Sequence, residues 1–267
     1  MILYEIAEKT KERVEHMKNE VPLEEVRRKA LSMPVNKELS FYKALKKDSI
    51  SKESVSFICE VKKASPSKGI IVEDFPYLEI AKEYEEAGAD AISCLTEPYY
   101  FQGSDSYLKE IAESVSVPVL KKDFIVDEYQ IYQAKLQKAA AVLLICSLLE
   151  TQKLKEYLEL AHSLGMAALV EAHDEEEIQK ALSVGAKTIG VNNRDLKTFT
   201  VDIQNSARLR KLVPKEVLFV SESGMKTPED IESLRQMGVN GVLIGETLMR
   251  QKDKKAALNY LRYGRKE

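Results

Sequence analysis

Short runs of β-branched and aliphatic residues recur along most of the chain, separated by stretches in which apolar residues follow helical spacing. The runs are SVSFICEVK, AISCL, VPVLKK, AVLLIC, AALVE, TIGVN, VLFVS and GVLIG, near residues 58, 93, 120, 143, 169, 190, 219 and 243. The helical stretches include YLEIAKEYEEAGA, DEYQIYQAKLQKA and PEDIESLRQMGV. Several end in a glycine that can adopt the left-handed conformation and so end a helix: Gly88, Gly165, Gly185 and Gly238. The pattern predicts about eight strands that alternate with helices.

Strict alternation at a spacing of roughly 25 to 30 residues indicates parallel strands joined by crossover helices. Two architectures fit, a closed barrel and an open doubly wound sheet. A doubly wound dinucleotide-binding fold would have GxGxxG after its first strand, whereas KKASPSKG follows here. Because about eight units use up the chain, we predict an α/β fold, the (β/α)8 TIM barrel.

The first 50 residues precede the first predicted strand. They contain two amphipathic helical patterns, around Ile2–Lys18 and Leu23–Met33, and Pro34 marks a break after the second. We therefore expect one domain over residues 1–267, with an N-terminal helical extension over 1–50 and the barrel over 51–267.

Composition excludes several classes of function. Forty basic and 43 acidic residues give a formal net charge of −3, so no global field attracts nucleic acid or an anionic membrane. The N-terminus is charged and lacks a long apolar stretch, which argues against a signal peptide or a membrane span. Cys59, Cys94 and Cys146 lie in separate apolar runs without metal or disulfide spacing, as in a reducing compartment. We expect a cytoplasmic protein that binds any anion locally.

Charged residues stand where a barrel places its catalytic groups, at the C-terminal ends of strands. Strand parity directs Glu60 and Lys62 to one face of the first strand, Lys122 into the lumen of the third, and Glu171 into the lumen of the fifth. Asn192 ends the sixth strand, and Ser221, Glu222 and Ser223 form the rim of the seventh. Each could be a solvated strand end, and Glu60–Lys62 could be a structural ion pair. Polar groups at five strand ends nevertheless indicate an active site.

Two segments have the form of a phosphate site. Gly224 and Gly245 lie between a strand and a helix start, where backbone N–H groups can approach an anion. They follow the seventh and eighth strands, the usual phosphate position of this fold. Ser65 can add a hydroxyl. The histidines, His16, His162 and His173, do not cluster, so we expect no metal site.

Seven motifs, several of them more specific than a generic barrel, follow in this order: CEVKKASPSKG, SCLTEPYYFQGS, PVLKKDFIVDEYQI, LVEAHDEEE, IGVNNRDL, VSESGM and GVNGVLIGETLMR. Through them the chain closely resembles the indole-3-glycerol-phosphate synthase family. The resemblance implies a (β/α)8 barrel with an N-terminal helical segment. It also implies a carboxy-lyase of tryptophan biosynthesis whose substrate is 1-(2-carboxyphenylamino)-1-deoxyribulose 5-phosphate. That reaction joins a ring carbon to the ketone carbon, then loses carbon dioxide and water, with no cofactor.

The resemblance also assigns roles to residues. It makes Lys122 the general acid that protonates the ketone oxygen, and Glu171 the acid–base group of the dehydration, supported by Glu60 and Lys62. Asn192 holds the leaving hydroxyl, and Glu222 and Ser223 complete the rim. The substrate-binding residues it implies are Phe101, Phe124 and Leu143 around the aromatic ring, Arg194 with Lys62 at the carboxylate, and Ser65, Gly224, Gly245 and Glu246 at the phosphate.

Two physical expectations accompany these roles. An ammonium in a dry lumen beside other cations should have a lowered pKa, so Lys122 is expected to release its proton near neutrality. Glu246 departs from the family pattern, in which many relatives have a small residue. A carboxylate there repels phosphate unless its side chain points away and only its N–H is used.

Other functions on the same scaffold stay open at this point, since fold does not settle function. A phosphoribosylanthranilate isomerase or a pentose-phosphate epimerase would share the phosphate site, but the isomerase would carry a Cys or Asp acid–base pair at the first and fifth strands. A barrel that only binds a phosphorylated ligand would need no lumenal proton donor such as Lys122. The expected ligand is a small phosphorylated molecule, and nothing in the sequence identifies a pathway enzyme as partner.

Overall fold

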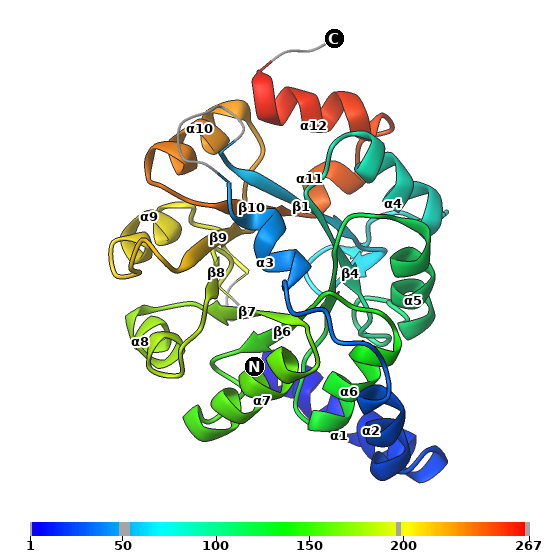
Figure 1. The fold of residues 1–267 in the computed structure, drawn as a ribbon. Coiled ribbons are helices and arrows are strands. Elements are labelled where there is room, and N and C mark those ends of the chain that lie inside the picture. Colours follow the sequence, from blue (N-terminus) through cyan, green and yellow to red (C-terminus); the bar gives the residue numbers. More distant parts are fainter. Residues whose placement is uncertain (1, 48–53, 196–198, 265–267) are drawn as a thin grey trace.

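The computed structural model describes residues 2–47, 54–195 and 199–264. Its parallel strands close into a barrel in the order β1-β10-β9-β8-β7-β6-β5-β4 (Figure 1). The barrel strands are β1 (Ser56–Val61), β4 (Ala91–Leu95), β5 (Val119–Lys122), β6 (Ala141–Ile145), β7 (Ala167–Ala172), β8 (Thr188–Asn192), β9 (Leu218–Glu222) and β10 (Gly241–Ile244). These are the eight predicted runs, so the TIM barrel prediction is confirmed.

Helices surround the barrel, one or more after each strand. They are α4 (Tyr77–Glu86), α5 (Asp105–Ser114), α6 (Glu128–Leu136), α7 (Thr151–Ser163), α8 (Glu175–Ser183), α9 (Gln204–Arg210), α10 (Pro228–Gln236), α11 (Glu246–Met249) and α12 (Lys254–Tyr263). The predicted C-terminal glycines Gly88, Gly165, Gly185 and Gly238 all have positive φ, between 75° and 85°. Since this conformation is strained for other residues, these glycines end their helices as expected.

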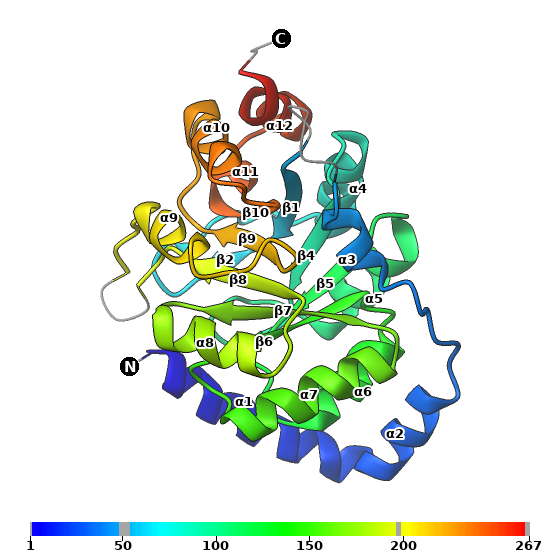
Figure 2. The ribbon, with the colours of Figure 1, turned by 60° about the vertical axis from the view of Figure 1, so that its left-hand side comes forward.

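The N-terminal segment forms helices α1 (Ile2–Glu20), α2 (Leu23–Leu31) and α3 (Ser40–Leu45). The first two match the predicted patterns, and Figure 2 shows them alongside α6 and α7. The third was not predicted. Its Phe41 and Leu45 are fully buried and pack with lumen residues such as Ala141, while Ser56 at the start of β1 donates to the carbonyl of Ala44. Helix α3 therefore closes the N-terminal end of the barrel and leaves the opposite mouth for chemistry.

Strand parity divides the apolar residues into two cores. Ile58, Leu120, Leu169 and Val220 fill the lumen, and the alternate residues of the same strands pack against the helices. Each strand therefore points its last lumenal residue at the C-terminal mouth. A short hairpin of β2 (Ala64–Ser65) and β3 (Gly69–Ile70) in the loop after β1 lies over this mouth.

Candidate active site

A cavity of about 910 Å³ opens at the C-terminal mouth of the barrel. Every residue to which the family resemblance assigned a role in catalysis or substrate binding lines it: Glu60, Lys62, Ser65, Phe101, Lys122, Phe124, Leu143, Glu171, Asn192, Arg194, Glu222, Ser223, Gly224, Gly245 and Glu246. Ser221, placed at the rim by the sequence, instead faces outward and bonds to the side chains of Asn193 and Ser206. The parity of β9 accounts for this, because Ser221 and Glu222 point to opposite faces.

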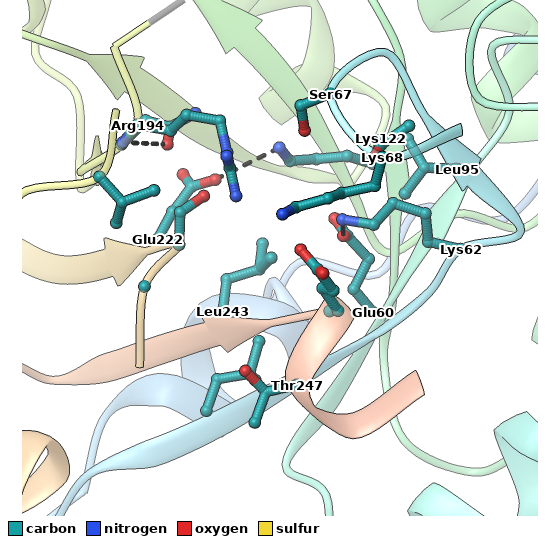
Figure 3. Close-up of a pocket in the computed structure, with 18 of the residues that line it drawn as sticks. Glu60, Lys62, Ser67, Lys68, Leu95, Lys122, Arg194, Glu222, Leu243 and Thr247 are labelled. Atoms are coloured by element: carbon teal, nitrogen blue, oxygen red, sulfur yellow. Dashed lines mark hydrogen bonds and ion pairs between the residues drawn. The ribbon is translucent and has the colours of Figure 1, made fainter. Parts of the chain in front are cut away.

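Lys122 is the centre of a cluster of buried charges. Its Nζ lies 3.3 Å from Glu222 Oε2, as Figure 3 shows, and 3.5 Å from Glu171 Oε2. Glu60, whose charge also acts on Lys122, forms an ion pair with Lys62, with Oε1 and Nζ 2.5 Å apart. The cluster thus combines cations and carboxylates from β1, β5, β7 and β9.

Two glycines make room for these side chains. A Cβ on Gly190 of β8 would overlap the carboxylate of Glu222. A Cβ on Gly245 would overlap the carboxylate of Glu60 and come within 2.9 Å of Lys62 Nζ. Glycine at position 245 is therefore required by packing as well, apart from any contact with phosphate, because it leaves space for the Glu60–Lys62 pair.

The expected lowering of the Lys122 pKa was wrong. Burial does oppose the charge, but the carboxylates of Glu222, Glu171 and Glu60 outweigh it and raise the pKa of Lys122 well above its ordinary value. The expectation failed because it assumed that neighbouring cations dominate, whereas carboxylates from three other strands act on Lys122. Lys122 is therefore fully protonated in the substrate-free site, which is the form that a proton donor needs.

The three carboxylates differ in protonation. Burial raises the pKa of Glu171, but Lys122, His173 and a hydrogen bond to Asn192 overcome this effect and lower it. Lys62 and Lys122 likewise overcome burial and lower the pKa of Glu60. For Glu222, burial and the charge of Glu171 outweigh Lys122 and raise the pKa to about 7. Glu60 and Glu171 are thus ionised at neutral pH, while Glu222 holds a proton part of the time.

This assignment gives a pH-dependent prediction for Glu222→Gln. A carboxyl whose pKa rises from 4.5 to about 7 on folding lowers the free energy of unfolding as pH rises through that interval. Glutamine does not titrate and lacks this effect. The difference between the melting temperature of the variant and that of the parent should therefore be roughly 2 to 6 °C more favourable to the variant at pH 8 than at pH 5. Calorimetry at both pH values measures the difference. An equal shift at the two pH values would contradict a Glu222 pKa of about 7, because it would mean that folding does not change proton binding at this residue across the interval.

Two aromatic rings form one wall of the cavity. The centroids of Phe101 and Phe124 are 6.0 Å apart with planes inclined by 38°. The buried carboxylate of Glu97 accepts N–H groups of residues 99, 100 and 101 at 2.7–3.0 Å and so fixes the loop that carries Phe101. The carboxylate of Asp123 accepts a hydrogen bond from the N–H of Phe124, and both of its oxygens accept from the guanidinium of Arg13 in α1. The aromatic wall is therefore held by buried acids that the sequence reasoning missed.

The predicted phosphate end lies across the cavity. Gly224 has a φ of +99°, and Gly245 directly precedes α11. The start of α10 is already capped, because the Asp230 carboxylate accepts the N–H groups of Lys226 and Thr227. These N–H groups are therefore not available to an anion. Of the anion site expected at two helix starts, the loop around Gly224 and the start of α11 remain. The Glu246 side chain turns to Arg250, with Oε1 and Nε 3.0 Å apart.

The cavity also includes a hydrogen-bonded pair from the end of β8 and lining residues that the sequence did not predict. The Asn192 Oδ1 atom accepts the N–H of Arg194, whose guanidinium donates to the carbonyl of Phe199. Helix α1 contributes Ile2, Leu3 and Ile6, and the loop after β1 contributes Lys68, which is labelled among the lining residues in Figure 3. The amphipathic pattern of α1 was visible in the sequence, but not that its apolar face reaches the cavity.

Within 2–47, 54–195 and 199–264, no three His, Cys, Asp or Glu side chains are grouped as metal ligands would be. In the same part of the chain, no helix has the length and apolar character needed to cross a membrane.

Comparison with solved structures identifies the architecture. The chain matches 3-hexulose-6-phosphate synthase with a TM-score of 0.62 and 17% identity, over 78% of this chain and 98% of that one. It matches thiamine phosphate pyrophosphorylase from Pyrococcus furiosus with a TM-score of 0.60 and 15% identity, over 79% and 95%. At these identities the likeness concerns the fold alone.

Comparison of sequences is more specific. The model of the family described as indole-3-glycerol phosphate synthase matches residues 3–261. The indole-3-glycerol phosphate synthase of Ruminiclostridium cellulolyticum is 55% identical over 98% of this chain and 99% of its own length. That of Endomicrobium trichonymphae is 56% identical over 94% and 95%. The chain therefore belongs to the indole-3-glycerol phosphate synthase family.

Proposed function

We propose that the cavity catalyses the ring closure of 1-(2-carboxyphenylamino)-1-deoxyribulose 5-phosphate to indole-3-glycerol phosphate, as a carboxy-lyase of tryptophan biosynthesis. The observation that carries the proposal is the Lys122 ammonium held between Glu171 and Glu222 in a lumen with an aromatic wall. The family to which the chain belongs supports the same reaction.

Lys122 acts in the first step. The ring carbon that bears the carboxylate attacks the ketone carbon, and the ketone oxygen becomes an alkoxide as the bond forms. An alkoxide is a stronger base than the lysine amine, so the proton moves from Nζ to that oxygen despite the raised pKa of Lys122. Carbon dioxide then leaves, its bonding electrons restore the aromatic ring, and the anilino nitrogen takes back its lone pair. The electrons come from the substrate, so the proposed reaction uses no cofactor.

Glu171 acts in the second step. The hydroxyl formed from the ketone leaves as water after it receives a proton, and Glu171 removes a proton from the carbon between the nitrogen and the reacting centre. Glu171 suits this role because it is ionised. Asn192 holds the leaving hydroxyl, the Glu60–Lys62 pair supports the proton transfers, and Glu222 and Ser223 complete the rim. Because two protons are given and one is taken, each turnover consumes one proton from solvent.

The remaining residues orient the substrate. Phe101, Phe124 and Leu143 enclose the aromatic ring, and Arg194 with Lys62 faces its carboxylate. Ser65, Gly224, Gly245 and the N–H of Glu246 bind the phosphate. Orientation is a large part of the rate, since the flexible chain must fold back onto its own ring.

The test compares two substrates. We expect the purified chain to convert the carboxyphenylamino-deoxyribulose phosphate with a rise in indole fluorescence, and to leave phosphoribosylanthranilate unchanged. Turnover of phosphoribosylanthranilate alone would favour the isomerase. Tight binding of both compounds with no turnover would favour a barrel that only binds phosphorylated ligands.

Inorganic phosphate should inhibit competitively, because it occupies the site around Gly224 and Gly245. Replacing Glu246 with Gln removes a negative charge beside that site, so the inhibition constant for phosphate should fall several-fold. Initial rates at constant ionic strength, with chloride as control, measure both effects. Purely non-competitive inhibition would place the phosphate elsewhere.

We further propose that residues 1–267 are one domain, with residues 1–50 as an extension that completes the mouth of the barrel. The free buried thiols of Cys59, Cys94 and Cys146 support a reducing compartment and hence the cytoplasm.

A further inference from the structure

His173 connects the active site to a carboxylate outside it. It follows β7 directly and is two residues beyond Glu171. Its Nε2 lies 3.5 Å from Glu171 Oε1, and its Nδ1 lies 3.2 Å from Glu177 Oε2 in α8. The imidazole thus bridges a cavity carboxylate and a helix carboxylate, although His173 itself is absent from the cavity lining.

The ring is fixed from several elements. The Glu177 carboxylate also accepts the backbone N–H of His173 at 2.8 Å, and the N–H of Glu177 donates to the capping residue Asp174 at 2.9 Å. From α9, the amide of Asn205 donates to the carbonyl of His173 at 3.1 Å. With the side chain only 20% exposed, the imidazole has little freedom to turn away from Glu171.

Glu171 consequently has a cation at each oxygen. Oε2 faces Lys122 and Oε1 faces His173, both at 3.5 Å. The charged groups that act on His173 are Glu171 from β7, Glu177 from α8 and Glu222 from β9. Burial opposes the imidazolium, but these carboxylates raise the pKa of His173 to about 9. The ring is therefore a cation at neutral pH and contributes to the lowered pKa of Glu171.

We propose that His173 is a positioning residue for Glu171, whose imidazolium keeps that carboxylate ionised and aimed at the substrate during the dehydration step. The inference rests on the proposed function, because it assigns His173 to the base of that reaction. His173 does not line the cavity, so its proposed effect on the reaction is exerted only through Glu171.

The test is the pH dependence of kcat in His173→Ala. Loss of the cation should raise the pKa of Glu171, so the acid limb of the kcat profile should move upward by about one pH unit. At pH 7 Glu171 is ionised in both proteins, so the expected fall of kcat there, about 10- to 100-fold, reflects a carboxylate that is no longer aimed at the substrate. KM should change less than about threefold, because the substrate contacts lie elsewhere. Added imidazole should restore part of the activity of the variant and none of the parent.

Two further variants make the result decisive. Glu177→Gln keeps the ring but removes its outer partner, so it should shift the acid limb in the same direction by less. His162→Ala changes a half-buried histidine of α7 outside the cavity and should leave the profile unchanged.

The outcomes separate the two proposals. A parent enzyme without turnover would overturn the proposed function and this inference together. The parent enzyme could instead be active while the pH profiles of kcat of His173→Ala and Glu177→Gln coincide with the parent profile. That result would overturn the role of His173 alone, even if the melting temperatures of the variants fall.

Discussion

Replacing Lys122 with methionine is expected to lower kcat by at least about 100-fold, the smaller value typical for loss of a general acid. Methionine keeps a long side chain of similar reach but carries no proton. The phosphate and ring contacts lie elsewhere in the cavity, so KM should move much less than kcat. Steady-state indole fluorescence measures both constants, and circular dichroism verifies the fold.

The neighbouring lysine provides the control. Lys121 lies on the opposite face of β5, fully buried, and pairs with Asp105 and with Gln137 Oε1, the latter at 3.0 Å. Lys121→Met removes the same charge at the adjacent position, so it should lower the melting temperature and leave kcat of the folded protein within a few-fold. A folded Lys122→Met variant that keeps more than about a tenth of parental kcat would contradict the acid role.

Replacing Glu171 with glutamine is expected to reduce indole formation by about 100- to 10,000-fold, because the amide cannot accept the proton in the dehydration. Ring closure and decarboxylation do not need that base. In a single turnover the variant should therefore release carbon dioxide while indole fluorescence stays low, and the ring-closed alcohol should accumulate. Equal slowing of both signals would mean that Glu171 acts before decarboxylation.

Strand parity accounts for how much of the site was predictable. A strand with period two must point Lys121 and Lys122 to opposite faces, and the apolar run before them identifies the buried strand. In the structure Lys121 pairs with Asp105 in the helix layer, and Lys122 lies in the lumen. The same rule places Glu60, Glu171 and Asn192, so the charged and polar residues at the strand ends followed from the sequence, whereas the contribution of helix α1 and of Lys68 did not.

The electrostatics of the site did not follow, because they depend on which strands meet when the barrel closes. Glu171 and Glu222 are 51 positions apart, and the strand between theirs, β8, brings both to Lys122. Local sequence around Lys122 shows only another lysine and an aspartate. The raised pKa of Lys122 and the proton on Glu222 are thus properties of the closed barrel.

The missed helix α3 has a different cause. Its six residues, FYKAL preceded by serine, are too few to establish a periodic pattern, and Leu39 at its start has a φ of +47°. Its formation depends on burial of Phe41 and Leu45 in the lumen, which is a tertiary effect.

In the proposed reaction this cavity couples ring closure to loss of carbon dioxide and water. The direct measurement is a single turnover of carboxyphenylamino-deoxyribulose phosphate with excess enzyme, in which carbon dioxide and indole fluorescence are followed together. We expect one carbon dioxide and one indole-3-glycerol phosphate per substrate, with carbon dioxide never released later than indole is formed. Substrate that is bound but unchanged, or converted without release of carbon dioxide, would contradict this expectation.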